Sequence, residues 1–206
     1  FLTLCLVLFY CSKESNDKSV SIRFFDNNFK DKTIVVAGST IIDGAVLWIN
    51  DKKIKLIGDA LEATGLFYYN EKIYVTGWQY GGNGSIWTMN KDGSDQTHIE
   101  LEGKYSEGQR IFVHNDDIYV GGYFDQGSCY WKNGSKTNLT TNADSMSWGI
   151  WIDSDNNIFN AGYYMKSHSL IPSFWKNNKR TNLSRPRHGD GEATVSYTHL
   201  TLPTIE

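Results

Sequence analysis

The stretch Ile118–Gly122 (IYVGG) is one of four copies of a short phrase in which an apolar, β-branched or aromatic run ends in glycine. The other copies are Ile34–Gly38 (IVVAG), Ile73–Gly77 (IYVTG) and Ile158–Gly162 (IFNAG). A tryptophan follows each glycine after a short interval, at Trp48, Trp87, Trp131 and Trp175. Successive copies lie about 40 residues apart, which is the period of a four-stranded propeller blade.

Each repeat has the order of short strands and tight turns that is typical of a β-meander. We expect the phrase ending in glycine to be the innermost strand and the tryptophan run to be the second. A polar turn such as Asn133-Gly134 precedes a short third strand, and a fourth strand of the type GLFYYN leads into the next repeat. Because glycine weakens a strand, its recurrence marks a close approach of backbones. The sequence therefore predicts an all-β protein: a β-propeller fragment of about four four-stranded antiparallel blades, forming an open arc of a larger ring.

The first residues have the character of an export signal. Residues Phe1–Tyr10 (FLTLCLVLFY) form an uncharged apolar run that is short for a membrane-spanning helix but suits the core of a signal peptide. Cys11 directly follows this run, and the stretch around the cysteine resembles the lipobox of bacterial lipoproteins, in the loose form found in Bacteroidota. Leu8 fits that pattern and Tyr10 departs from it, since a small residue usually precedes the cysteine. The resemblance implies cleavage before Cys11 and attachment of a diacylglycerol to its thiol; the alternative is an ordinary secretory signal.

Four segments follow from these patterns. Residues 1–11 are the signal peptide core and lipobox, residues 12–31 a polar tether, and residues 32–194 the propeller repeats, the last of them incomplete. The tether contains an apolar patch, Ile22–Phe25, which is either an extra strand of a closed ring or part of a linker. In residues 195–206, the stretch Val195–Thr204 (VSYTHLTLPT) resembles a translated sequencing adapter and would then be non-native; the alternative is a native terminal strand with good β propensity.

Composition narrows the classes of function. A net charge of −3 with scattered charges offers no basic stripe, so we expect no nucleic-acid partner. Cys129 is the one cysteine of the repeats, which excludes a disulfide within them, and we expect it to pack in the core. The chain has no GxSxG, HExxH or phosphate-loop motif, and its histidines lack the spacing of metal ligands. We therefore predict no catalytic residues, no cofactor and no metal site.

The candidate ligand contacts are aromatic residues just after the repeat glycines. In this position rings could form stacking platforms for sugars or a peptide, with Asp43, Gln79, Asp125 and His168 as polar neighbours. The alternative is that these rings pack between blades. The candidates are Trp78, Tyr80, Tyr123, Phe124, Tyr163 and Tyr164.

The repeats also resemble a family. The stretch Ile118–Leu139, with IYVGGY followed by CYWKNG and a Thr/Asn-Leu, looks like the unit of uncharacterised propeller lipoproteins of Bacteroidota; the likeness is recognisable at Ile73–Thr88 and Phe159–Leu183 and weak in the first repeat. The resemblance implies a propeller and a lipid-anchored location at the cell envelope, on the outer membrane or the cell surface, and brings no catalytic residues.

We therefore expect a binding or scaffold module that contacts an envelope protein or glycan and meets the membrane only through its lipid anchor. The alternative is a propeller carbohydrate-active enzyme, a glycoside hydrolase or lyase, which would need two carboxylates facing one cavity. The glycine phrases carry no carboxylate, which argues against the enzyme.

Overall fold

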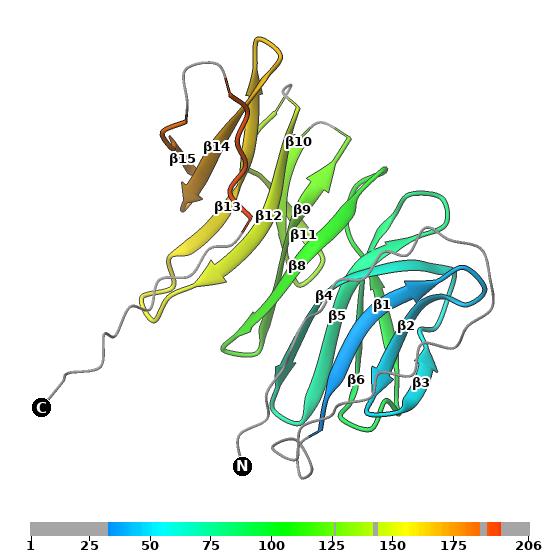
Figure 1. The fold of residues 1–206 in the computed structure, drawn as a ribbon. Helices are drawn as coiled ribbons and strands as arrows, with labels where there is room; N and C mark the ends of the chain where they lie inside the picture. The colour runs from blue at the N-terminus through cyan, green and yellow to red at the C-terminus, as the bar shows by residue number, and fades with distance from the viewer. Residues whose placement is uncertain (1–32, 126, 142–143, 186–188, 195–206) are drawn as a thin grey trace, which may run out of the picture.

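The computed structural model describes residues 33–125, 127–141, 144–185 and 189–194, and within them the protein is built from antiparallel β-sheets (Figure 1). The first sheet contains three described strands: β1 (Val35–Thr40), β2 (Gly44–Ile49) and β3 (Lys52–Lys55). The second contains β4 (Ala60–Tyr69), β5 (Lys72–Gln79), β6 (Gly84–Asn90) and β7 (Thr97–Glu100). The third contains β8 (Glu107–His114), β9 (Asp117–Phe124), β10 (Gly127–Lys132) and β11 (Ser135–Asn138). The fourth contains β12 (Ser145–Ile152), β13 (Ile158–Lys166), β14 (Ser169–Lys176) and β15 (Lys179–Asn182).

The sheets are four consecutive meanders, and none closes on itself. They stand in sequence order, with β4, β8 and β12 packed next to one another on the inner side of the arc (Figure 1). This arrangement confirms the fold class: an open arc of about four propeller blades. We call each sheet a blade and β4, β8 and β12 the inner strands.

The grouping of strands within a blade differs from the sequence expectation. The glycine phrase was expected to be innermost, but β5, β9 and β13 are the second strands of their blades. The inner position belongs to the preceding run of the GLFYYN type, which sequence reasoning assigned to the end of the previous repeat. The reason is the short turn between the two runs, such as Asn70-Glu71, which favours pairing within one hairpin.

Asparagine residues fix the turn that follows three of the four tryptophan strands, β2, β10 and β14. Asn50, Asn133 and Asn177 have positive φ angles of 51°, 51° and 47°, a conformation that asparagine tolerates. Their side-chain oxygens accept hydrogen bonds from the backbone N–H groups of Ile34, Ile118 and Ile158 at 2.9, 2.8 and 2.8 Å. The same asparagine thus makes the turn and anchors the start of the glycine phrase.

The repeat glycines lie where each inner strand bulges. The register between inner and second strands shifts at Ala63/Gly65, Gly108/Arg110 and Ser147/Gly149. Beside these bulges, a Cβ atom on Gly77, Gly122 or Gly162 would overlap a carbonyl of the inner strand, namely that of Glu62, Glu107 or Met146. The glycine is therefore a steric requirement, as the sequence argument expected.

Tryptophans connect neighbouring blades. The side chains of Trp87, Trp131 and Trp175 are fully buried, as expected for rings between sheets. The indole Nε1 of Trp87 donates to the carbonyl of Ile57 at 3.0 Å, and that of Trp131 donates to the carbonyl of Glu102 at 2.8 Å. Both carbonyls belong to the preceding blade's exit loop, so each ring fills the interface and fastens it. Trp48, in the first blade, is only partly buried.

Cys129 lies in this interior, as expected. It is fully buried among Ile111, Val120 and Trp131, and burial raises the pKa of its thiol. The thiol therefore stays protonated and behaves as a small apolar group.

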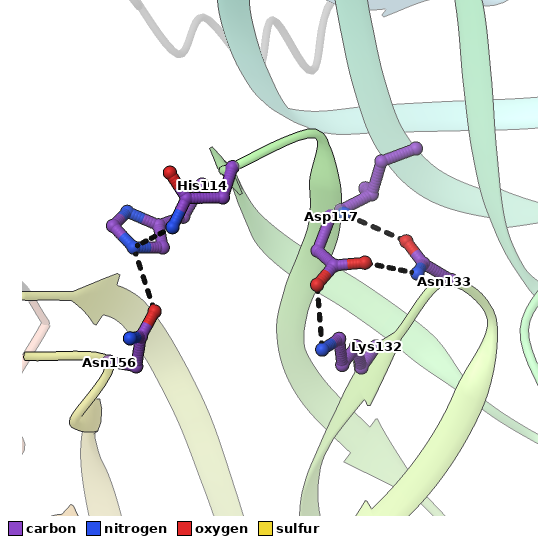
Figure 2. A network of polar contacts seen from close by, with 7 residues as sticks. His114, Asp117, Lys132, Asn133 and Asn156 are labelled. Carbon is purple, nitrogen blue, oxygen red and sulfur yellow. Dashed lines mark hydrogen bonds and ion pairs between the residues drawn. The ribbon is translucent and has the colours of Figure 1, made fainter.

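At the strand ends where β8 turns into β9, polar groups link the turns of adjacent blades. The Nε2 atom of His114 lies 3.1 Å from Oδ1 of Asn156, which belongs to the turn before β13 (Figure 2). In the same region Asp117 pairs with Lys132 at 2.6 Å and accepts a hydrogen bond from Asn133 at 2.7 Å (Figure 2).

The acidic stretch between β12 and β13 is a turn. Asp153 accepts hydrogen bonds there from the backbone N–H groups of Asp155 and Asn157.

Several sequence predictions lie outside the described residues. These are the signal and lipobox with Cys11, the tether with Ile22–Phe25, and the adapter-like stretch Val195–Thr204. Within the described ranges, no helix has the length and apolar character needed to cross a bilayer.

The glycine constraint gives a stability prediction. We expect Gly122→Ala to lower the free energy of unfolding by about 3 kcal/mol, because the new Cβ overlaps the Glu107 carbonyl and lies 3.0 Å from the ring of Trp131. The control is Gly81→Ala, where φ is +95° and no atom lies within 4 Å of the new Cβ; it should lose only the cost of left-handed backbone, about 1–2 kcal/mol. Urea unfolding measures both, and an equal loss would contradict the steric role of Gly122.

Candidate functional site

The six candidate aromatic residues separate into three environments. Trp78, Tyr123 and Tyr163 occupy the same position of β5, β9 and β13, directly after the repeat glycine, and each is partly buried. Phe124 and Tyr164 are the next residues along their strands and therefore project to the opposite side of the sheet. Tyr80 lies in the turn after β5 and its side chain is 66% exposed.

Phe124 and Tyr164 are covered by cations of their own blades. Phe124 is buried in the core, and the Nζ atom of Lys136 lies 3.5 Å from its ring centroid. The guanidinium of Arg180 lies 3.6 Å from the centroid of Tyr164. These contacts hold outer strands against the second strand of the blade, so both rings have a packing role.

Trp78, Tyr123 and Tyr163 face the inner strands instead. Their register partners are Glu62 on β4, Glu107 on β8 and Met146 on β12. Cross-strand partners project from the same side of a sheet, so each ring has a Glu or Met beside it. β8 packs against both β4 and β12, so the three pairs lie at the same strand ends of adjacent blades.

Burial and neighbouring carboxylates raise the pKa values of three groups in this region. The pKa of Glu62 is raised, first because the carboxyl is partly buried and second because the charge of Glu107 is near. Desolvation raises the pKa of Tyr123, and the carboxylates of Asp144, Asp125 and Glu107 raise it further. Burial, with Asp144 as the nearest charge, raises the pKa of Tyr163 to about 12, and its hydroxyl lies 3.4 Å from Asp144 Oδ1.

We call this set the aromatic–acidic cluster: Glu62, Trp78, Glu107, Tyr123, Asp144 and Tyr163. Sequence reasoning found its rings but missed Glu62 and Glu107, because it looked for carboxylates on the glycine phrases. The sequence does contain a pattern that marks both glutamates: each lies two residues before the bulge of its strand, in LEATG and SEGQR. Only the pairing of inner and second strands shows that these positions adjoin the rings.

Other polar candidates serve the scaffold. Asp43 pairs with Lys53 at 2.5 Å, which lowers the pKa of its carboxyl. Gln79 is buried and donates to Ser85 at 2.7 Å, with the His98 ring also 2.7 Å away. His168 has a φ angle of 63° in the turn before β14. These residues therefore fix turns and strand contacts.

Chemically, the cluster can bind through ring faces and carboxylate oxygens. Aromatic faces stack on apolar sugar faces or attract cations, and paired carboxylates accept hydrogen bonds or hold positive charge. Among the described residues, no group of three His, Cys, Asp or Glu side chains is arranged to hold a metal ion.

Comparisons with known proteins assign the chain to no family. No family model and no curated protein matches the chain. Among solved structures, the chain is similar to the computationally designed Ika8 protein at a TM-score of 0.45 and 13% sequence identity. The match covers 86% of this chain and 52% of that one, so this chain spans about half of the designed protein. A likeness at this level carries no argument about function.

The raised pKa of Glu62 predicts how stability depends on pH. The pKa of this carboxyl is about 4.3 in the unfolded chain and higher in the folded protein. Protonated Glu62 therefore adds stability at pH values below the unfolded pKa, and this stability is lost as the pH rises through the folded pKa. We therefore expect Glu62→Gln to match the wild type at low pH and to exceed it at pH 7 by less than about 1 kcal/mol.

The matched control is Glu71→Gln at the opposite end of the blade. The ion pair with Lys91 lowers the pKa of Glu71, so removing this charge should not stabilise the protein at pH 7. Thermal unfolding at pH 4 and pH 7 measures both variants. An identical pH dependence of Glu62→Gln and the wild type would show that Glu62 is not held in an unfavourable environment.

Proposed function

We propose that the chain is an exported, lipid-anchored β-propeller that acts as a binding or scaffold module at the bacterial cell envelope, and that the aromatic–acidic cluster is its binding site. The observation that carries the proposal is the repetition of one arrangement, a ring beside an inner-strand side chain, at the same register in three consecutive blades. A stable fold does not need carboxylates there, because β12 has Met146 at the same position.

The blade architecture supports this proposal. Each ring stands at the end of a hydrogen-bonded strand, and the buried Trp87 and Trp131 fasten the first three blades to one another. A rigid scaffold lowers the entropic cost of binding, because the contact side chains are already ordered. Binding sites on propellers and solenoids commonly use such repeated positions along one surface.

The proposed location at the cell envelope rests on sequence features alone. The apolar run before Cys11, the polar stretch after it and the resemblance to propeller lipoproteins of Bacteroidota support anchoring of Cys11 to the outer membrane or cell surface. The polar residues that follow Cys11 would place the blades outside the headgroup region, where the cluster can meet an envelope protein or glycan.

A second candidate function is a carbohydrate-active enzyme, and one observation favours it. Glu62 has a raised pKa and lies near a second carboxylate, Glu107, which is the pattern of a general acid beside an ionised partner. Turnover of a glycan that is lost in both Glu62→Gln and Glu107→Gln would support this candidate over the binding module.

Lipid attachment is tested at Cys11. Cells that express the chain are labelled with an alkyne analogue of palmitate, and we expect the wild type to incorporate label and Cys11→Ser to lose it. Cys129→Ser is the control, because that thiol is buried in the blades and should not carry lipid. Equal labelling of the wild type and Cys11→Ser would contradict the anchor.

Binding is tested on isolated envelope fragments. We expect saturable binding of the chain, and about a tenfold loss of affinity in Trp78→Ala, because base, sugar or side-chain stacking on one ring contributes about 1–3 kcal/mol. Lys91→Ala, an exposed change at the opposite end, should bind like the wild type. Near-ultraviolet circular dichroism confirms that each variant is folded. Wild-type binding with no saturation, or equal binding by Trp78→Ala, would refute a site at this cluster.

A further inference from the structure

Within the part of the chain that the structure describes, the carboxylates of the aromatic–acidic cluster form no ion pair. The charges that act on Glu62 and Tyr123 all come from carboxylates, namely Glu107 for Glu62, and Asp144, Asp125 and Glu107 for Tyr123. The described ion pairs involve other residues: Lys53–Asp43, Lys91–Glu71 and Lys132–Asp117. A cation placed among these carboxylates would relieve the mutual repulsion of Glu62 and Glu107.

The rings of the cluster lack the cations that cover their neighbours. Lys136 lies over Phe124 and Arg180 over Tyr164, both on the other side of the sheet. Lys132 and Lys176 lie over Tyr119 and Phe159 at 5.5 and 5.3 Å. Within the described ranges, no lysine or arginine lies over Trp78, Tyr123 or Tyr163. A cation from another molecule would therefore meet partly buried rings that are not already paired with a cation.

Exposed apolar side chains border the cluster. Ile41 and Ile42, at the tip between β1 and β2, are 85% and 82% exposed, and Tyr105, in the connection before Glu107, is 65% exposed. Tyr80 follows Trp78 by two residues and is also exposed. Tyr105 is held in place against the β5–β6 turn, since a Cβ on Gly82 would lie 3.3 Å from its ring, and the Ser106 N–H donates to the Gly82 carbonyl at 2.8 Å. We call Ile41, Ile42, Tyr80 and Tyr105 the apolar tips.

The tips and the cluster lie at the same end of the blades. A Cβ on Gly44, which ends the β1–β2 tip, would overlap the carbonyl of Ala60, two residues before Glu62. Tyr105 precedes Glu107 by two residues on the same connection. The apolar tips therefore border the carboxylates and rings, whereas the other exposed large apolar residues belong to other segments: Ile57 after β3, Ile99 in β7 and Leu183 after β15. Exposed apolar groups that gather in this way mark interaction surfaces.

We propose that this surface binds a basic peptide segment of a partner protein. Lysine or arginine side chains enter between the rings of Trp78, Tyr123 and Tyr163 and pair with Glu62, Glu107 and Asp144, while apolar residues of the segment contact the apolar tips. The proposal rests on the binding function proposed above and names its ligand class. Charge complementarity decides between the classes, because a neutral glycan would use the rings but leave the repelling carboxylates uncompensated.

The experiment uses the full chain in mild detergent and a short fluorescein-labelled peptide of alternating lysine and leucine. Fluorescence anisotropy gives its affinity, with a glutamate–leucine peptide and a glutamine–leucine peptide of the same length as controls. We expect binding of the lysine peptide only. Its affinity should fall as the ionic strength rises from about 0.01 to 0.15 M, over which the Debye length shortens from about 30 to about 8 Å.

Two variants locate the binding surface. Glu62→Gln combined with Glu107→Gln should weaken the lysine peptide about tenfold, which corresponds to about 1.4 kcal/mol, and should flatten the salt dependence. Glu71→Gln removes an acidic charge at the opposite end and should leave the affinity unchanged. If the double variant unfolds, Trp78→Ala replaces it, with the same expected loss for the lysine peptide.

The outcomes separate this inference from the proposed function. Binding of neutral envelope glycan fragments without binding of the lysine peptide would overturn the inference and leave the binding module intact. Equal affinity for the lysine, glutamine and glutamate peptides, or full retention of lysine-peptide binding in the double variant, would also overturn it. Absence of binding to the peptides and to envelope fragments alike would overturn both.

Discussion

The architecture depends on one steric constraint: the carbonyl of a bulged inner strand occupies the space where a side chain of the second strand would begin. Gly77, Gly122 and Gly162 each meet this condition, with the carbonyls of Glu62, Glu107 and Met146 in the place of a Cβ. The bulge adds a residue to the inner strand and increases its local bend. The next blade packs against that strand, and in two blades a buried tryptophan, Trp87 or Trp131, bonds to the exit loop of the preceding blade. The position of the cluster follows from the same contact, because Glu62 and Glu107 supply the carbonyls that exclude a Cβ on Gly77 and Gly122.

The sequence predicted the parts of the fold that depend on local chemistry. Asn133 and Asn177 adopt the left-handed backbone that a tight turn needs, and Trp87 and Trp131 fill the space between sheets, both as expected. The order of strands within a blade was predicted wrongly, because the period of the repeat is the same wherever the unit is taken to begin. Periodicity fixes the length of a unit but not its boundary, which depends on the pairing of β4 with β5 rather than with β3.

The candidate site was predicted in part for the same reason. Trp78, Tyr123 and Tyr163 could be found from their distance to the glycine, but Glu62 and Glu107 come from strands that the sequence assigned to another blade. Phe124 shows the other limit: it differs from Tyr123 by one position, yet strand alternation sends it into the core under Lys136. A stretch of aromatic residues identifies a region of the chain, whereas the register identifies which rings are accessible.

The three inner strands have interchangeable backbones but different side chains beside the rings: glutamate in β4, glutamate in β8 and methionine in β12. At this position two blades therefore have a carboxylate, whereas the third has a polarizable thioether and takes its negative charge from Asp144, just before β12. An elongated ligand lying across the blades would meet a different environment at each end, which favours one direction of binding over the other. A substitution at this one position in any blade would change that direction without disturbing the glycine contact beneath it.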